Sequence, residues 1–230
     1  MKKIISTALS IIFIFSFTIS GYASDINYSR YEEYLGYIEQ GILSEEISYS
    51  TWMNLINENE RLEAMLEESD QFELVYSSTD PSRNSAFTMR YGDIYITNAT
   101  SSAGLTGHAG IAMNDISIIH IRGYGHRVST ISHTSWLELY SGGWTKVYRH
   151  TNSDAAWQAA GWARTNYYNS NAEYAISLDP TVTNPTYCSK IVWQSYYFIR
   201  PGAYADPPAN GAVILPYDLP NLITPNTQVY

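Results

Sequence analysis

The chain has 230 residues and a formal net charge of −9, with 45% hydrophobic and 15% charged residues. This length accommodates one domain of ordinary size with a short appendage, and the composition is typical of a globular chain, not of a disordered one. Nothing in the sequence resembles the clustered basic residues that nucleic-acid binding needs, so we expect no nucleic-acid partner.

The first 23 residues have the layout of a secretory signal peptide. Lys2 and Lys3 are followed by an apolar run over residues 8–20 and by small residues that end at Ala23. The run is too short for an ordinary transmembrane helix, and no later stretch is apolar enough to span a bilayer. We therefore expect a mature chain that begins at Ser24, is secreted and has no stable membrane span.

The net negative charge lies in the roughly 50 residues that directly follow this signal, and the rest of the chain is balanced. Residues 25–75 contain 13 acidic residues and two arginines, whereas from residue 76 onward nine acidic residues balance nine basic ones. We therefore divide the chain into a signal peptide (1–23), an acidic helical segment (24–76) and a main domain (77–230). A solvated helical face is the simplest explanation of the acidity; a pro-segment or partner-binding arm is the alternative.

Two helices are predicted in the acidic segment, over roughly residues 28–68. The first ends at Gly41, and the second begins near Ser48 or Ser50. The second helix has an apolar stripe formed by Leu55, Ile56, Leu62, Met65 and Leu66. Two short helices bury little surface by themselves, so we expect the segment to dock on the main domain, either as support or as a gate over a cleft.

The main domain begins with a polar stretch over residues 77–85 that is typical of a linker. Four strands are then predicted, at 93–98, 108–113, 117–122 and 145–149, with a tight turn at Asn114-Asp115 between the second and third. A helix follows over 154–168. A further helix starts at the signal in residues 184–186 and runs to Arg200.

Cys188 is the only cysteine. A lone thiol in a secreted chain cannot form an internal disulfide, so it is buried and inert, bonded to another chain, or reactive. Its predicted position in the first turn of a helix favours the thiolate, because unpaired N–H groups and the helix dipole stabilise negative charge there. The same N–H groups can bind the oxyanion of a tetrahedral intermediate.

His108 and His120 are the histidines best placed to assist this thiol. Each lies among apolar residues on one strand of the predicted hairpin, and a ring in such surroundings needs a hydrogen-bond partner. The hairpin can bring the two rings together, with the Cys188 helix packed over them. Two satisfied core histidines are the alternative, but the combination with a lone thiol at a helix start favours catalysis.

Three strand motifs resemble those of NlpC-type papain-fold peptidases: residues 92–94, 107–111 and 118–120. The cysteine block Tyr187–Trp193 comes after these strands, whereas in most such enzymes it comes before them. This order resembles the permuted branch that includes the YiiX-like proteins and the lecithin:retinol acyltransferase relatives. The segment Leu215–Leu219 also resembles the end of the YiiX-like domain.

The resemblance implies an α+β fold of the circularly permuted papain-like type. An antiparallel sheet would pack against the cysteine-bearing helix, with an N-terminal helical appendage outside the shared fold. It also implies a nucleophile at Cys188, a base at His108 that forms a thiolate–imidazolium pair, and an orienting residue at His120, where many YiiX-like members have a glutamate. The Cys188 N–H would contribute to the oxyanion hole, with Tyr187 as a candidate side-chain donor. No metal or other cofactor is needed.

The sequence thus predicts a secreted cysteine hydrolase that cleaves an amide or peptide bond, as in cell-wall peptides, through an acyl-enzyme. A lipid ester or amide hydrolase, or an acyltransferase, is the alternative within the same chemistry. Two other classes stay open. One is a metal site built from Cys188, His108 and His120 with His126 or His133; the other is a binding module for cell wall or lipid that uses some of the 21 tyrosines.

Overall fold

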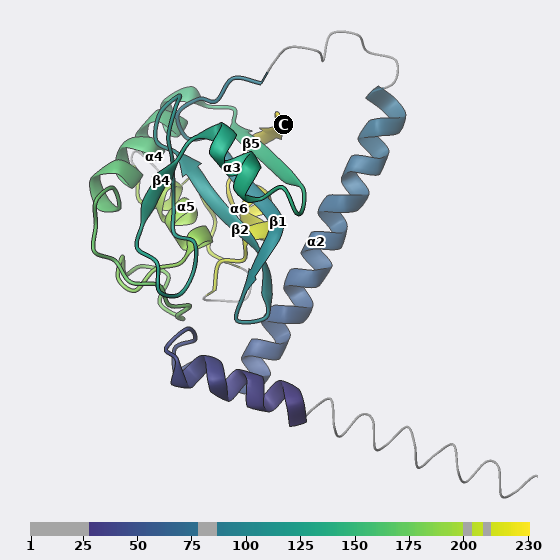
Figure 1. The fold of residues 1–230 in the computed structure, drawn as a ribbon. Coiled ribbons are helices and arrows are strands. Elements are labelled where there is room, and N and C mark those ends of the chain that lie inside the picture. Colours follow the sequence, from purple (N-terminus) through teal and green to yellow (C-terminus); the bar gives the residue numbers. More distant parts are fainter. Residues whose placement is uncertain (1–27, 78–86, 200–203, 209–212) are drawn as a thin grey trace, which may run out of the picture.

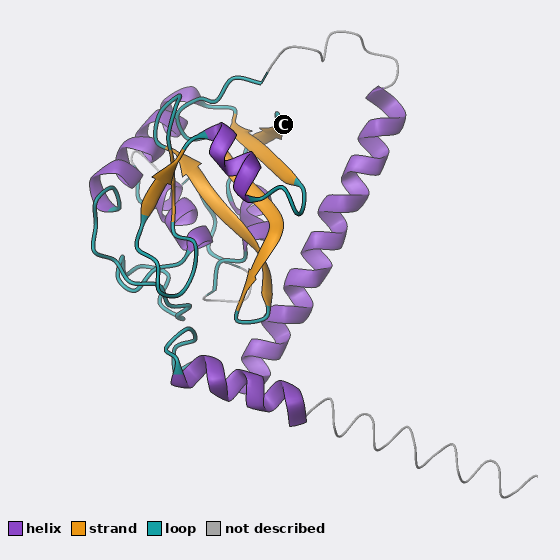
Figure 2. Ribbon diagram, in the orientation of Figure 1, coloured by secondary structure: helices purple, strands orange, loops and turns teal. Residues whose placement is uncertain are grey.

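The computed structural model describes residues 28–77, 87–199, 204–208 and 213–230. The predicted signal peptide and nearly all of the predicted linker lie outside these ranges. The helices are residues 28–39, α2 (Tyr49–Ser77), α3 (His133–Leu139), α4 (Ser153–Asn166), α5 (Cys188–Tyr197), the 3₁₀ helix η2 (Pro216–Asp218) and α6 (Leu219–Leu222). The strands are β1 (Ile94–Ser102), β2 (Leu105–Ala112), β3 (Ile118–His120), β4 (Ser129–Ile131), β5 (Thr145–His150) and β6 (Asn226–Gln228) (Figures 1 and 2).

The fold is α+β, with one antiparallel sheet in the order β4-β3-β2-β1-β5-β6. Helices α4 and α5 pack on one face of this sheet and α3 on the other (Figure 1). The four predicted strands and the helices α4 and α5 are confirmed, with boundaries shifted by a few residues. The predicted turn joins β2 to β3, where the side chain of Asn114 accepts from the N–H groups of Ile116 and Ser117.

The alternation of β2 and β3 places the two histidines on the α3 face of the sheet. Ala109 and Ile111 of β2 point toward α5, whereas Gly110 lies against Trp136 of α3. Since successive side chains point to opposite faces, His108 shares the side of Gly110. The ring of His108 therefore packs against Trp136 of α3, and the backbone N–H of the next residue, Ala109, faces Cys188 at the start of α5.

The motif at the start of β1 is structural. Gly92 has φ +76°, and a Cβ there would lie 2.5 Å from the carbonyl oxygen of Ala156 on α4. The fully buried Asp93 accepts two hydrogen bonds of 2.7 Å from the Arg149 guanidinium of β5. These two residues hold β1 against α4 and β5.

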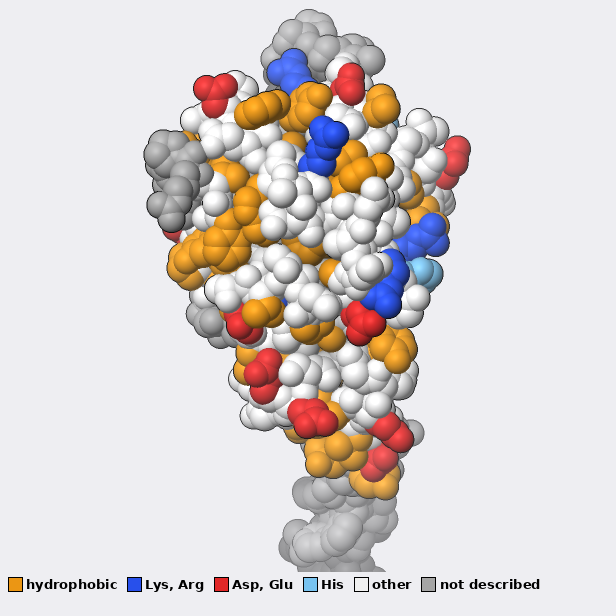
Figure 3. Space-filling view, turned by 90° about the vertical axis from the view of Figure 1, so that its left-hand side faces the viewer, with side chains coloured by type: hydrophobic (Ala, Val, Ile, Leu, Met, Phe, Trp, Pro, Cys, Tyr) orange, Lys and Arg blue, Asp and Glu red, His pale blue; other side chains and the backbone are white. Residues whose placement is uncertain are grey.

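The acidic segment docks on the main domain. Trp52 of α2 is fully buried and donates from Nε1 to the Ala103 carbonyl at 2.7 Å, and Asn59 donates to Thr106 at 3.0 Å. These contacts attach α2 to the β1–β2 hairpin. Acidic side chains gather at the end of the molecule where the first helix lies (Figure 3), as expected for a solvated face.

The predicted helices agree with the structure at the end of the first and the start of the second, but the end of α2 and the burial of Met65 differ. Gly41, which has φ +72°, closes the turn after the first helix, and Ser48 accepts from the Thr51 N–H at the start of α2, both as predicted. However, α2 continues to Ser77, beyond the predicted end near residue 68. Met65 is half exposed instead of buried, because the face that packs on the main domain is formed by Trp52 and the other apolar residues.

Candidate active site

Cys188 is the first residue of α5, so it occupies the predicted position at a helix start. Its side chain is buried, and the sulfur lies 4.0 Å from the Ser189 hydroxyl. The N–H groups of Ala109, Ser189 and Cys188 itself also donate toward the sulfur. The Ala109 contact places the sulfur against the peptide that follows His108 on β2.

Burial raises the pKa of the Cys188 thiol, and these hydrogen bonds offset that effect only in part. The helix start lowers the pKa of the thiol as expected, but burial has the larger and opposite effect. The helix N-terminus is present, but desolvation of a buried anion outweighs it. The net shift of the pKa favours the neutral thiol over the thiolate.

His108 and His120 form a direct pair. Nε2 of His108 lies 2.9 Å from Nδ1 of His120, as the hairpin predicted. Burial lowers the pKa of His108 far below its ordinary value, with further contributions from His120 and Arg122. Burial likewise lowers the pKa of His120 to about 4, and Arg122 and His126 add to this shift. Both rings are therefore neutral near pH 7, which disfavours the expected thiolate–imidazolium pair.

Two aromatic residues near α3 complete the surroundings of the histidines. Trp136 stacks on the His108 ring at a centroid distance of 5.3 Å and an angle of 21°, and Tyr140 lies 5.1 Å from the same ring. The Tyr140 hydroxyl is 3.5 Å from Nδ1 of His120. Burial raises the pKa of Tyr140, and the nearby Cys188 contributes to this shift. Tyr140 thus lies near both the histidine pair and the sulfur.

The space beside the sulfur is small and mostly apolar. A cavity of about 20 Å³ is bounded by Cys188, Gly107 and Tyr174, together with Leu105, Ile176, Val213, Ile214, Leu215 and Pro216. This volume holds about one water molecule. Gly107 is required here, because it has φ +98° and a Cβ would lie 2.8 Å from the ring of Tyr217.

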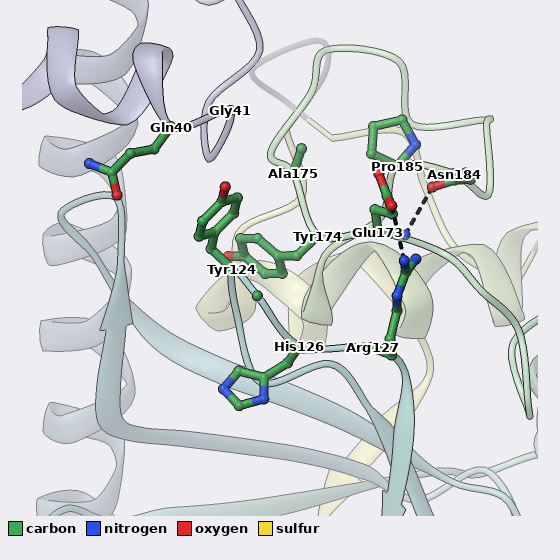
Figure 4. A pocket seen from close by; sticks show the side chains of 11 residues that line it. Gln40, Gly41, Tyr124, His126, Arg127, Glu173, Tyr174, Ala175, Asn184 and Pro185 are labelled. Carbon is green, nitrogen blue, oxygen red and sulfur yellow. Dashed lines mark hydrogen bonds and ion pairs between the residues drawn. The ribbon is translucent and has the colours of Figure 1, made fainter.

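A much larger pocket lies beside this cavity, and we call it the vestibule. Its volume is about 600 Å³, and its lining includes Tyr124, His126 and Arg127 from the β3–β4 loop and Gln40 and Gly41 from the acidic segment (Figure 4). Tyr174 borders both the vestibule and the Cys188 cavity. The Arg127 guanidinium forms an ion pair with Glu173 at 3.0 Å across the vestibule wall.

Side chains of α5 hold the loop that leads to Cys188. The buried Lys190 donates from Nζ to the carbonyls of Asp179 at 2.6 Å and Pro185 at 3.1 Å. Gln194 donates to the carbonyls of Pro180 and Val182. Because Cys188 is the first residue of α5, these contacts fix the helix start and the chain before it together.

In the part of the chain that the structure describes, the remaining predicted residues make no hydrogen bond to the pair, although the charge of His126 acts on His120 and Tyr187 borders the Cys188 cavity. The Tyr187 hydroxyl accepts from the Ile214 N–H at 2.9 Å. His126 lines the vestibule, and Nδ1 of His133 contacts the Tyr95 hydroxyl at 3.0 Å. Within the described ranges, no three His, Cys, Asp or Glu side chains are arranged to hold a metal ion. No helix in those ranges is both long and apolar enough to cross a membrane.

Sequence reasoning missed Trp136, Tyr140 and Tyr174. The first two lie four residues apart on α3 and its cap, and this spacing places both on one helix side. The spacing would have indicated their proximity had α3 been predicted. Tyr174 lies in an irregular segment, and no pattern in the sequence connects it with Cys188.

Comparisons with known proteins place these residues in context. A model of the family described as "Lipoprotein N-acylation protein LnsA-like" matches residues 61–215. The match therefore begins inside α2 and includes Cys188, His108 and His120. A Bacillus thuringiensis protein described as an uncharacterized 30.3 kDa protein is 31% identical over 260 residues, covering 97% of this chain and 96% of that protein. No solved structure matches.

Proposed function

Because the chain belongs to the LnsA-like lipoprotein N-acylation family, we propose that it is an acyltransferase in which Cys188 carries the acyl group. The family indicates acyl transfer or hydrolysis, which agrees with the alternative left open by the sequence. Peptide or amide hydrolysis, the first prediction, requires the same thioester with water as the acceptor. The residues that border the sulfur are mostly apolar, which suits contact with an acyl chain more than with a polar peptide backbone.

The observation that carries this proposal is the combination of a lone buried thiol with a neutral histidine pair. The sulfur receives hydrogen bonds from the Ala109 and Cys188 N–H groups, and the His108 ring uses Nε2 to contact His120. Because Nε2 of His108 is engaged with His120, we assign the role of proton acceptor for the thiol to Nδ1 of His108. A neutral base can accept the proton of a neutral thiol, so the two groups match in protonation state.

The reaction would proceed in two transfers. The Cys188 sulfur attacks the carbonyl carbon of an acyl ester while its proton moves to Nδ1 of His108. The tetrahedral intermediate collapses, the alcohol leaves with that proton, and a thioester remains. An amine then attacks the thioester carbonyl and loses a proton to His108, which returns it to the departing thiol.

The histidine pair and the backbone would stabilise charge during these steps. When His108 becomes cationic, the Nδ1 atom of His120 can accept the hydrogen bond from its Nε2–H and hold the ring in one orientation. The N–H groups at the start of α5 would bind the oxyanion. Base and oxyanion stabilisation are each typically worth about two to four powers of ten in rate.

The acceptor is a nitrogen in this proposal, because the family description names N-acylation of lipoproteins. The predicted location outside the cytoplasm stays a prediction that suits lipoprotein acceptors. Water is the competing acceptor and would make the same site a hydrolase. The outcome depends on which nucleophile reaches the thioester first.

Intact-mass spectrometry tests the acyl-enzyme. Incubation with a fatty acyl ester should add the mass of one acyl group, and neutral hydroxylamine should remove it, as expected for a thioester. Cys188→Ala should not gain the mass, whereas Ser189→Ala, the adjacent control, should. An adduct that persists in Cys188→Ala would contradict the proposal. Adding a peptide amine should then give an acylated peptide; release of free fatty acid alone would support the hydrolase.

A further inference from the structure

Substrates need a route to Cys188, and the cavity at the sulfur is too small to be a binding site. Its volume of about 20 Å³ leaves no room for an ester group. The vestibule, at about 600 Å³, has the size of an ordinary ligand site. The two spaces share one lining residue, Tyr174, and we infer that its ring forms part of the wall between them.

Backbone hydrogen bonds hold the chain just after Tyr174 between two flanking segments, one near Thr186 and one near Ile42. The Ala175 N–H donates to the Thr186 carbonyl at 3.0 Å, two residues before Cys188. The Ile176 N–H donates to the Ile42 carbonyl at 2.9 Å, and the Ser44 N–H donates to the Ile176 carbonyl at 2.9 Å. The acidic segment therefore supplies an outer extended segment that supports the wall, and its Gln40 and Gly41 also line the vestibule.

A fixed backbone leaves rotation of the side chain as the means of opening the wall. The Tyr174 ring is buried and close to Cys188, which contributes to the raised pKa of its hydroxyl after the main effect of burial. The contact of the hydroxyl with Ser102 would break on rotation, and the vestibule offers space for the displaced ring. No movement of the sheet or of α5 is required.

We propose that the acyl donor and acceptor reach Cys188 through the vestibule and that Tyr174 determines the size of the groups that pass. This inference rests on the proposed function, in which Cys188 is acylated. Tyr174 is then a specificity-determining residue. The acidic segment forms part of the substrate entrance and holds the gate in place.

Alkylation of Cys188 tests this route directly, because no other cysteine can react. The rates with iodoacetamide, a small reagent, and pyrene maleimide, a bulky one, are each normalised to a free thiol. Tyr174→Ala should raise the ratio of bulky to small labelling about tenfold or more, the lower end of the discrimination that single groups provide in enzyme pockets. Tyr174→Phe, which keeps the ring, and Tyr168→Ala, an exposed control outside both spaces, should leave the ratio unchanged. An unchanged ratio in Tyr174→Ala overturns the gate.

A second variant tests the route without altering Tyr174. Gln40→Trp adds bulk at the exposed end of the first helix inside the vestibule, whereas Glu39→Trp adds it at the adjacent position outside the lining. Only the former should slow labelling by pyrene maleimide, and equal rates in both overturn the vestibule route even if Tyr174→Ala fails to fold. Labelling needs access to the sulfur but no acyl transfer, so its failure is distinct from failure of the hydroxylamine experiment.

Discussion

The Nε2 atom of His108 lies 2.9 Å from the Nδ1 atom of His120, and both rings are buried between the sheet and α3. One nitrogen of this contact must carry the proton and the other must accept it. Since burial lowers the pKa of both rings, the pair holds a single shared proton in the contact and no net charge. The protonation state of this pair determines how the site responds to pH.

Alkylation of Cys188 should have no plateau near neutral pH. Burial raises the pKa of the thiol, and the neutral histidines provide no cation to stabilise the thiolate. We therefore expect the iodoacetamide rate to rise continuously from pH 6 through pH 9, because it follows the thiolate fraction. A rate that levels off below pH 8 would instead indicate a preformed thiolate–imidazolium pair.

Folding stability should fall as the pH decreases below 6.5. The pKa of His120 is about 4 in the folded protein and 6.5 in the reference state, so the unfolded chain binds a proton first. The contribution of His120 to the free energy of unfolding is fully present above pH 6.5 and is lost as the pH falls toward 4. The loss is about 3 kcal/mol for this group alone. His120→Asn should reduce this loss, measured as the difference between the free energies of unfolding in urea at pH 7 and at pH 4.5. The exposed control Tyr168→Phe should retain it, and an equal loss in both variants would contradict this account.

Arg122 should influence the histidines through its charge. Burial is the main cause of the lowered pKa of His120, and Arg122 is the next. Arg122→Gln removes the cation and should shift the His120 titration upward in an NMR experiment. Arg164→Gln removes an exposed arginine from α4 and should leave the titration unchanged. Identical titrations in both variants would show that solvent screens the Arg122 charge.

The strands with apolar runs and the helices with clear start signals were predictable from the sequence, because their burial pattern is local. Helix α3 was not, since Trp136 is its only buried residue and a single residue forms no periodic stripe. The short exposed strand β4 offered no pattern for the same reason. The positions of Cys188, His108 and His120 followed from their elements. Their protonation did not, because desolvation depends on segments that are distant in the chain, such as those that contain Tyr140 and Tyr174.

The ion pair between Asp93 and Arg149 should contribute to stability and not to chemistry. Asp93 is fully buried, and Arg149 is its cationic partner. Asp93→Asn leaves the guanidinium without its counter-ion and should lower the free energy of unfolding by about 3–5 kcal/mol. Glu58→Gln, which breaks the exposed ion pair with Arg61, should cost less than about 1 kcal/mol. Similar costs in denaturant unfolding would contradict the structural role of Asp93.

Docking of the acidic segment can be tested with two substitutions on α2. Trp52 is fully buried and hydrogen-bonded to Ala103, whereas Met65 on the same helix is half exposed. Trp52→Ala should lower the free energy of unfolding by about 3–5 kcal/mol, and Met65→Ala should change it by less than about 0.5 kcal/mol.

Because residues 42–44 support the wall at Tyr174, loosening the segment should also disturb the entrance. Trp52→Ala should therefore reduce acylation of Cys188 under conditions where the chain stays folded. Increased acylation in that variant would mean that the segment acts as an inhibitory cover, as a pro-segment does, and not as part of the entrance.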